Sequence, residues 1–153
     1  MNYPLEKPAI TQEFGADPAS YARFGYPGHN GLDLWTAREP PYVYNIEQGV
    51  VEKVGWEEHG YGKYVVILHA GGWRTYYAHL SQVHVLPGSR LAASTALGLM
   101  GATGFARGAH LHLGVRYAAA RAPAYKGYVD PLPLLRGEPL RLLSGAGGDE
   151  VIL

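Results

Sequence analysis

The sequence contains no cysteine. Disulfide bonds and thiolate metal ligands are therefore excluded, so a metal site in this chain must use histidine and carboxylate side chains. The chain also carries no net charge, because 13 basic residues balance 13 acidic ones. Without an overall field to attract nucleic acid or anionic lipid, we expect neither a nucleic-acid partner nor a membrane partner.

Long apolar runs are missing as well. No segment approaches the roughly 20 apolar residues of a membrane-spanning helix. Residues 1–10 lack the basic stretch and apolar core of a secretory signal peptide. We therefore expect synthesis in the cytoplasm without a signal peptide, and secretion is the alternative if a leader has been removed.

The residues that are abundant predict a β protein. Hydrophobic residues make up 47% of the 153 positions, which is enough for one folded domain. Glycine, proline and tyrosine are frequent, as is typical of short strands joined by turns. We predict a mainly β, single-domain fold with an antiparallel sheet and few short helices. The expected elements are strands at residues 32–35, 48–56, 63–70, 73–79, 96–100 and 110–116, a tight turn at residues 71–72, a helical turn after Asp17 and a loop at residues 118–122.

The pattern decays toward the C-terminus. Beyond Pro133 no further element is evident, and residues 144–149 (SGAGGD) have the composition of a flexible tail. We assign residues 1–136 to the folded domain and residues 137–153 to a C-terminal tail.

Two histidines flank a leucine in His110-Leu111-His112. In a strand, residues i and i+2 project to the same face about 6.6–6.8 Å apart, so both rings would face one side while Leu111, Leu113 and Val115 face the core. One ring could bind a metal while the other reaches a bound water or a substrate. Taken alone, the pattern is more often two surface histidines on a half-exposed strand.

A second candidate group is the pair His29 and Asp33 in the segment GHNGLD (28–33). A neutral imidazole nitrogen and a carboxylate oxygen together suit zinc. The two glycines argue against a helix and favour a tight loop that leads into a strand. Taken alone, the pair also fits a simple polar turn.

A third candidate is His79 in the segment YYAHLS (76–81). We expect it to end a strand and to share a face with Tyr77. A lone histidine beside aromatic residues is more often structural than catalytic.

In this order and with these flanking residues, the three segments resemble the lysostaphin-type, or LytM-like, zinc endopeptidases of peptidoglycan. The boxes H-x-G-x-D, Y-x-H-L-S and H-L-H are specific in combination, and the resemblance runs from about Leu5 to about Leu135. It implies the barrel-sandwich hybrid fold of those peptidases. The matching stretches are ITQEFG (10–15), GHNGLDL (28–34), GVVEKV (49–54), GYGKYVVIL (60–68), YAHLS (77–81), LGLMGATG (97–104), GAHLHL (108–113) and VDPL (129–132).

Carried over position by position, the resemblance implies functional residues. His29, Asp33 and His112 would bind one zinc ion per chain, and His79 and His110 would be the catalytic histidines. The implied substrate is the peptide part of bacterial peptidoglycan, residues 1–136 would be the catalytic domain, and we expect a monomer. The resemblance leaves open whether a glycine bridge or a D-alanyl cross-link to a diamino acid is cut.

Two positions depart from the family pattern. Leu113 stands where phenylalanine is usual, and Gly114 stands where an acidic residue is common. Neither touches a ligand position, so the departures put in doubt strand packing and the groove floor but not the metal.

Other residues are assigned more loosely. Tyr61, Tyr77 and Arg107 lie in segments that flank the site in the family, which makes them candidates for the substrate groove or for support of the ligands. His59, His69 and His84 match no functional position, and we expect them to be structural or solvated.

The expected chemistry follows from the ligand set. Three protein ligands leave one position of a tetrahedral zinc for water, which is typical of a catalytic zinc. The sequence has no H-E-x-x-H motif, so histidine would have to move the protons.

Two other functions compete with an endopeptidase. A catalytically inactive member, acting as an activator of other wall hydrolases or as a structural phage component, predicts a broken ligand set, whereas this set is intact. A carbohydrate-binding or carrier module would need no H-x-G-x-D box. The setting that best fits a wall substrate without a signal peptide is a phage or prophage lysin, either an endolysin or a virion-associated lysin, and a bacterial enzyme is the alternative.

Overall fold

The computed structural model describes residues 2–117, 123–138, 141–142 and 151–152, so the predicted loop at 118–122 and the tail segment 144–149 lie outside the described residues. The prediction of a mainly β fold is confirmed: of the described residues, 41% lie in strands and 11% in helices. Within the described ranges, no helix is long and apolar enough to cross a membrane.

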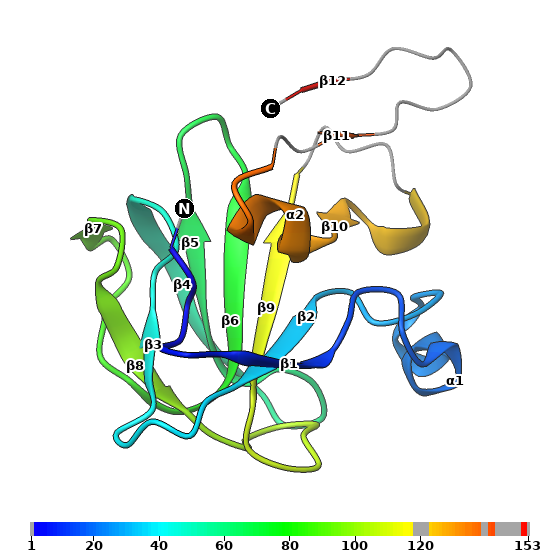
Figure 1. Cartoon of the computed structure of the whole chain (residues 1–153), viewed down its shortest axis with the longest axis horizontal. Coiled ribbons are helices and arrows are strands. Elements are labelled where there is room, and N and C mark those ends of the chain that lie inside the picture. Colours follow the sequence, from blue (N-terminus) through cyan, green and yellow to red (C-terminus); the bar gives the residue numbers. More distant parts are fainter. Residues whose placement is uncertain (1, 118–122, 139–140, 143–150, 153) are drawn as a thin grey trace.

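Ten strands form one antiparallel sheet (Figure 1). Short helical segments lie outside the sheet, and two further strands pair only with each other. The strands are β1 (Ala9–Gln12), β2 (Leu32–Trp35), β3 (Tyr42–Tyr44), β4 (Gly49–Glu57), β5 (Gly62–Leu68), β6 (Arg74–Val83), β7 (Arg90–Leu91), β8 (Ala96–Met100), β9 (Leu111–Arg116), β10 (Tyr128–Val129), β11 (Arg141–Leu142) and β12 (Val151–Ile152), and the helical segments are α1 (Pro18–Tyr21), η1 (Ala22–Phe24), η2 (Pro123–Tyr125) and α2 (Pro131–Leu135).

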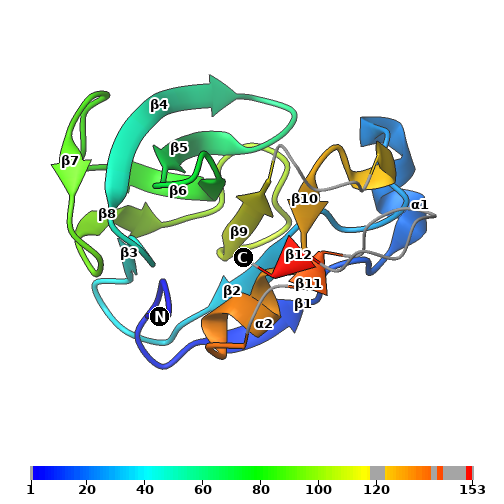
Figure 2. The ribbon, with the colours of Figure 1, turned by 90° about the horizontal axis from the view of Figure 1, so that it is seen from above.

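The sheet divides at β6. One edge of this strand pairs with β5, while the other edge pairs first with β9 and then, from Leu80 onward, with β8. Beyond β9 the sheet continues through β2 to β1, and beyond β8 it continues to β3 (Figure 2). The division therefore falls at His79, between the segments that pair with β9 and with β8.

His79 adopts an unusual backbone conformation at this point. Its φ is 64°, in the left-handed region that costs an L-residue roughly 1–2 kcal/mol. The register with β5 shifts between Tyr77 and Leu80, so β6 contains a bulge that turns the following side chains. The prediction that His79 ends a strand and shares a face with Tyr77 is wrong, because β6 continues to Val83 and the bulge turns His79 to the opposite face.

Tyr77 belongs to the core instead of the groove. Its side chain is fully buried, and its hydroxyl accepts a hydrogen bond from the backbone N–H of Ile46 at 3.1 Å. The candidate role of Tyr77 in a substrate groove is therefore also wrong.

The core lies on one face of β2 and β9. Leu32 and Leu34 alternate with Asp33 and are fully buried, as each strand places successive side chains on opposite faces. Burial of each such leucine contributes about 1.5–3 kcal/mol. Leu111, Leu113 and Val115 are fully buried in β9, which confirms the face predicted for them from the alternation.

The helix α2 closes the C-terminal side of this core. Asp130 caps its N-terminus by accepting a hydrogen bond from the Leu132 N–H at 3.0 Å. Leu134 and Leu135 then pack into the core cluster. The sequence pattern did not predict α2, whereas the helical turn expected after Asp17 is present as α1 and η1.

Candidate metal centre and its groove

Cross-strand pairing brings the candidate ligands together. Asp33 of β2 lies directly opposite His112 of β9, and His112 lies opposite Ala78 of β6. Side chains opposite each other in an antiparallel pair lie on the same face, with Cβ atoms about 4.5–5.5 Å apart. His29 enters from the loop before β2, which is held by a hydrogen bond from the Gly15 N–H to the His29 carbonyl at 2.8 Å.

Gly31 makes the approach of this loop to β9 possible. A Cβ atom at this position would lie 2.5 Å from the Leu113 carbonyl oxygen and 2.6 Å from Cε1 of His112. No side chain larger than hydrogen fits without moving the strand or the histidine. The tight loop predicted at residues 28–31 is therefore present, and it packs directly against a candidate ligand.

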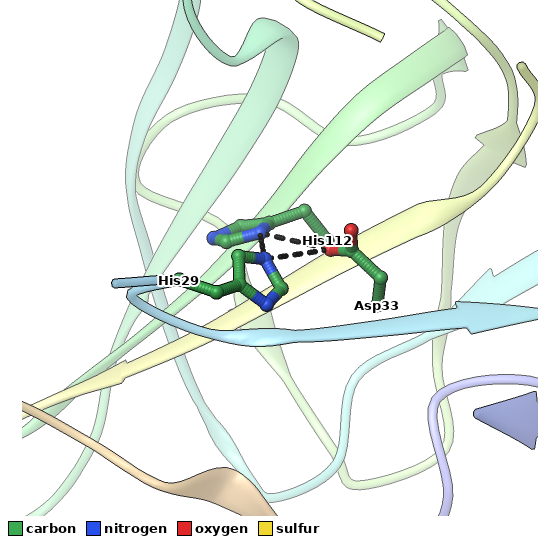
Figure 3. A group of neighbouring side chains, drawn as sticks. All are labelled: His29, Asp33 and His112. Carbon is green, nitrogen blue, oxygen red and sulfur yellow. Dashed lines mark hydrogen bonds and ion pairs between the residues drawn. The ribbon is translucent and has the colours of Figure 1, made fainter. Parts of the chain in front are cut away.

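Three side-chain atoms form a small triangle (Figure 3). Nε2 of His29 lies 2.9 Å from Nδ1 of His112 and 3.0 Å from Oδ1 of Asp33, and Nδ1 of His112 lies 3.1 Å from that oxygen. Ligand atoms about 2.0–2.1 Å from a tetrahedral zinc are separated by roughly 3.3 Å. The three atoms therefore have nearly the spacing of three corners of a zinc tetrahedron.

The remaining ring nitrogens fit the same arrangement. Nδ1–H of His29 donates to the Glu13 carbonyl at 3.0 Å, so Nε2 presents a lone pair to the triangle. Nε2 of His112 is buried and has no hydrogen-bond partner among the described residues. A metal bound at Nδ1 would leave the proton on Nε2, and the lack of a partner for this buried N–H costs about 1–3 kcal/mol. The donor set of two imidazoles and one carboxylate fits zinc.

The local electrostatics keep the ligands in metal-binding form. Burial alone raises the pKa of the Asp33 carboxyl, but hydrogen bonds to His112 and His29 and their positive charge outweigh it, so the pKa lies below its ordinary value. Burial lowers the pKa of His112. An ionised carboxylate and a neutral imidazole are the forms that bind a metal.

His79 and His110 lie beside the triangle, with ring centroids 4.7 Å apart. Nδ1–H of His79 donates to the Thr103 carbonyl at 2.7 Å, and Nδ1–H of His110 donates to the Gly108 carbonyl at 2.9 Å. Nε2 of His110 lies 3.4 Å from Oδ2 of Asp33. Burial lowers the pKa of His79 to about 4. All five residues named by the sequence analysis are therefore gathered in one place.

The triangle opens into a groove of about 660 Å³. Asp33, His112, His79 and His110 line it, whereas the fully buried His29 lies behind them. Tyr61 and Arg107 also line this groove, as expected for these two candidates. Tyr77, the third candidate, does not line it.

Tyrosines build one wall of the groove, and of these Tyr61 was a candidate from the sequence whereas Tyr76 and Tyr128 were not. Tyr61 packs on His112 with ring centroids 5.3 Å apart, and its hydroxyl accepts from Asn30 at 3.0 Å and donates to Tyr128 at 3.1 Å. Tyr76 lies beside Tyr128 with ring centroids 5.3 Å apart. The signal that could have found this wall is the excess of tyrosine, which numbers 12 against 3 phenylalanines.

Gly114 explains how these tyrosines fit. A Cβ atom at this position would lie 3.1 Å from Cε1 of Tyr128 and 3.3 Å from Cβ of Tyr76. The ring of Tyr128 and the Cβ of Tyr76 therefore occupy the space in which the acidic side chain common in the family would stand. The other departure, Leu113, is fully buried and concerns only core packing.

The other histidines lie away from this centre. His69 is buried, donates from Nδ1 to the Gln48 carbonyl at 2.8 Å and stacks on Trp73 with ring centroids 4.1 Å apart. His59 and His84 are exposed. Their positions agree with the structural or solvated roles expected from the sequence.

Comparisons with known proteins agree with this arrangement. The profile of peptidase family M23 matches residues 27–131. The peptidoglycan DD-endopeptidase ShyA of Vibrio cholerae is 41% identical over 85 residues, which cover 55% of this chain and 19% of ShyA. Across the curated relatives, the match spans 15–54% of each protein's length, so this chain corresponds to a part of them.

Solved structures share the fold. The catalytic domain of the antimicrobial peptidase lysostaphin from Staphylococcus simulans superposes with a TM-score of 0.70 at 25% identity, over 84% of this chain and 92% of that domain. A zinc-containing peptidase from Vibrio cholerae superposes with a TM-score of 0.69 at 30% identity, over 84% of this chain and 37% of that one.

Proposed function

Because the chain belongs to peptidase family M23, we propose that it is a zinc-dependent endopeptidase that hydrolyses peptide cross-links of bacterial peptidoglycan. The observation that carries the proposal is the triangle of ligand atoms from His29, Asp33 and His112 beside an open groove. The names of the relatives support it, since ShyA is a peptidoglycan DD-endopeptidase and lysostaphin is an antimicrobial peptidase.

The metal would supply one part of the chemistry. A zinc ion with three protein ligands activates water near neutral pH and polarises the carbonyl that is attacked. The chain supplies the ligands in the required form, with the carboxylate of Asp33 ionised and the Nε2 lone pair of His29 directed inward. Tyr61 supports this arrangement by packing on His112.

Protein groups must move the protons, and His79 and His110 are assigned this role. Each ring donates Nδ1–H to a backbone carbonyl, so Nε2 is the nitrogen that remains for proton transfer; in His110 it lies 3.4 Å from Oδ2 of Asp33. A neutral ring in this tautomer can take a proton at Nε2 and later return it to the departing amine. Ring centroids 4.7 Å apart allow both rings to reach the atoms of a single peptide bond.

An inactive family member is the second candidate function. It predicts that at least one ligand or one catalytic histidine is missing or misplaced. All five side chains are present and gathered at one groove, which favours the enzyme.

The proposal is tested by digestion of purified peptidoglycan of known cross-link chemistry with the zinc-loaded protein. Mass analysis of the released fragments is expected to show hydrolysed peptide bonds, and removal of zinc by a chelator is expected to abolish them. Fragments from glycan cleavage alone, or intact peptidoglycan in the presence of stoichiometric zinc, would contradict the proposal.

A further inference from the structure

The floor of the groove follows one strand and therefore has two distinct ends. His112 and Gly114 lie on the same face of β9, and His110 comes immediately before this strand. At the start of β9, the segment Phe105–Ala109 lines the groove, whereas Tyr76 pairs with Gly114 farther along the strand. The candidate metal centre lies between a loop end and a tyrosine end.

The two ends differ in chemical character. The tyrosine end presents the ring faces of Tyr61, Tyr76 and Tyr128, whose hydroxyls are in part bonded to one another. The loop end carries the cation Arg107 together with the exposed ring of Phe105. Apolar substrate groups are suited to the first end, whereas an anionic group is suited to the second.

The guanidinium of Arg107 is accessible from the groove. It is exposed and lines the groove, and its positive charge acts on the half-buried Tyr21, whose pKa it lowers against the larger raising effect of burial. In the part of the chain that the structure describes, Arg107 takes part in no ion pair or side-chain hydrogen bond, whereas Arg74 holds Glu52 at 2.6 Å and Arg116 donates to the Lys126 carbonyl at 2.9 Å. The planar guanidinium fork therefore remains available to a ligand in the groove.

We propose that Arg107 determines specificity by binding a carboxylate on the substrate residue next to the scissile bond. This inference rests on the proposed endopeptidase function. A guanidinium holds a carboxylate through two parallel hydrogen bonds, a geometry that a carboxamide cannot match. Arg107 lines the same groove as His79 and His110 and lies three residues before His110, in the loop that leads to it.

This assignment selects a class of cross-link. A diamino acid with two carboxyl groups keeps a free carboxylate on the carbon that bears the cross-linked amine. A glycine bridge has no such group beside any of its internal bonds, so it would leave Arg107 without a partner. The structure therefore favours a cross-link to a dicarboxylic diamino acid over a glycine bridge.

The test uses two cross-linked stem peptides that differ only in this carboxylate, which is free in one and amidated in the other. We expect the wild-type protein to prefer the free carboxylate by about tenfold in kcat/KM, the effect of a hydrogen bond to a charged group. Arg107→Gln is expected to lose this preference, mainly through a higher KM for the free carboxylate, because the contact is formed in substrate and transition state alike. Arg107→Lys should keep part of the preference.

Two controls separate this inference from the proposed function. Arg90→Gln removes an exposed arginine of β7, at the far edge of the sheet, and should leave the preference unchanged. Calorimetric binding of both peptides to His110→Ala measures recognition without hydrolysis. Equal rates and equal affinities for the two peptides, or an unchanged preference in Arg107→Gln, would overturn the role of Arg107 while leaving the endopeptidase intact. Absence of hydrolysis with preferential binding of the free carboxylate would instead overturn the proposed function alone.

Discussion

The side chains of the candidate centre are oriented by bonds on their far side. The Glu13 carbonyl fixes the tautomer of His29, and the Thr103 carbonyl fixes that of His79. Backbone carbonyls are rigid acceptors, so each ring turns a defined nitrogen toward the groove. The proposed roles in ligation and in proton transfer thus fall on different atoms, and mutation can separate them.

Replacement of either proposed catalytic histidine should strongly reduce turnover without loss of metal. We expect His110→Ala and His79→Ala to lower kcat by about 10²–10⁴-fold, the usual contribution of general acid–base catalysis, while zinc content stays at one per chain. His84→Ala removes an exposed histidine and serves as the matched control. Rates of wild-type size from either variant, measured with zinc content on the same sample, would remove that histidine from the mechanism.

His69 should make the stability of the metal-free protein depend on pH. Burial lowers its pKa in the folded state below the ordinary value of 6.5. Above pH 6.5, His69 is neutral in both the folded and the unfolded protein, and its full contribution to stability is present. As the pH falls, the unfolded chain binds a proton before the folded chain does. The free energy of unfolding therefore falls by at most about 1.4 kcal/mol per pH unit. The fall continues until the pH reaches the lowered pKa of the folded state.

Urea unfolding at pH 7.5 and pH 5.5 in the presence of a chelator measures this effect. His69→Gln should lose less stability between the two conditions than the wild type does, whereas the exposed His84→Gln should behave as the wild type. An identical pH dependence in His69→Gln and wild type would show that His69 titrates normally in the fold.

At the scale of elements, the candidate metal centre depends on one close contact. The loop before β2 packs directly against β9 at Gly31. Gly31→Ala places a methyl group against the Leu113 carbonyl and the His112 ring. Overpacking of this kind costs about 1–3 kcal/mol of stability, and displacement of His112 should also weaken zinc binding. Gly108→Ala, in a position with no atom within 4 Å of the added Cβ, is the matched control.

Thermal unfolding and zinc titration of these two variants provide the measurement. Loss of both stability and zinc affinity in Gly31→Ala alone is the expected result. Equal behaviour of the two variants would mean that the loop can move away from β9 without cost to the ligand.

Local pattern predicted some elements well and missed others for a physical reason. Residues 32–35 and 96–100 coincide with β2 and β8, because alternating or continuous apolar residues in them face a buried core. The positive φ values of Gly71 and Gly72 confirm the predicted turn. Strands β3, β7 and β10 have two or three residues each, and they exist through pairing with β8, β4 and β9 instead of through a pattern of their own.

The bulge in β6 is a second feature that local sequence pattern does not predict, and it lies within the candidate site. Alternation alone places His79 on the core face with Tyr77, and only the register with β5 reveals the extra residue that turns it toward the groove. Sequence could therefore name His79 through the resemblance to a family, but it could not give the orientation of the side chain. The contact between Tyr76 and Tyr128 could not be predicted from the sequence for a related reason, since the two residues meet only across β9.

At the scale of the whole molecule, the centre joins distant parts of the chain. His29 and Asp33 precede most of the sheet, whereas His112 belongs to β9, and the two segments meet only when β2 pairs with β9. A metal bound to all three residues should therefore stabilise the complete fold. The domain boundary proposed at residue 136 stays a prediction.

Removal of zinc should lower the stability of the entire domain. A ligand that binds only the folded state at 100 times its dissociation constant stabilises by about 2.7 kcal/mol, so chelation should lower the unfolding temperature in a single cooperative transition. Asp33→Ala lacks a ligand and should show no such shift. A chelator-induced shift of equal size in both proteins would place the stabilising metal elsewhere.

The central claim is that His29, Asp33 and His112 hold one zinc ion, and a crystal structure of the zinc-loaded protein tests it most directly. Anomalous scattering at the zinc absorption edge should give a single strong peak per chain, about 2.0–2.2 Å from Nε2 of His29, a carboxylate oxygen of Asp33 and Nδ1 of His112. A peak at any other position, or none at these three atoms in a protein shown to contain zinc, would contradict the account.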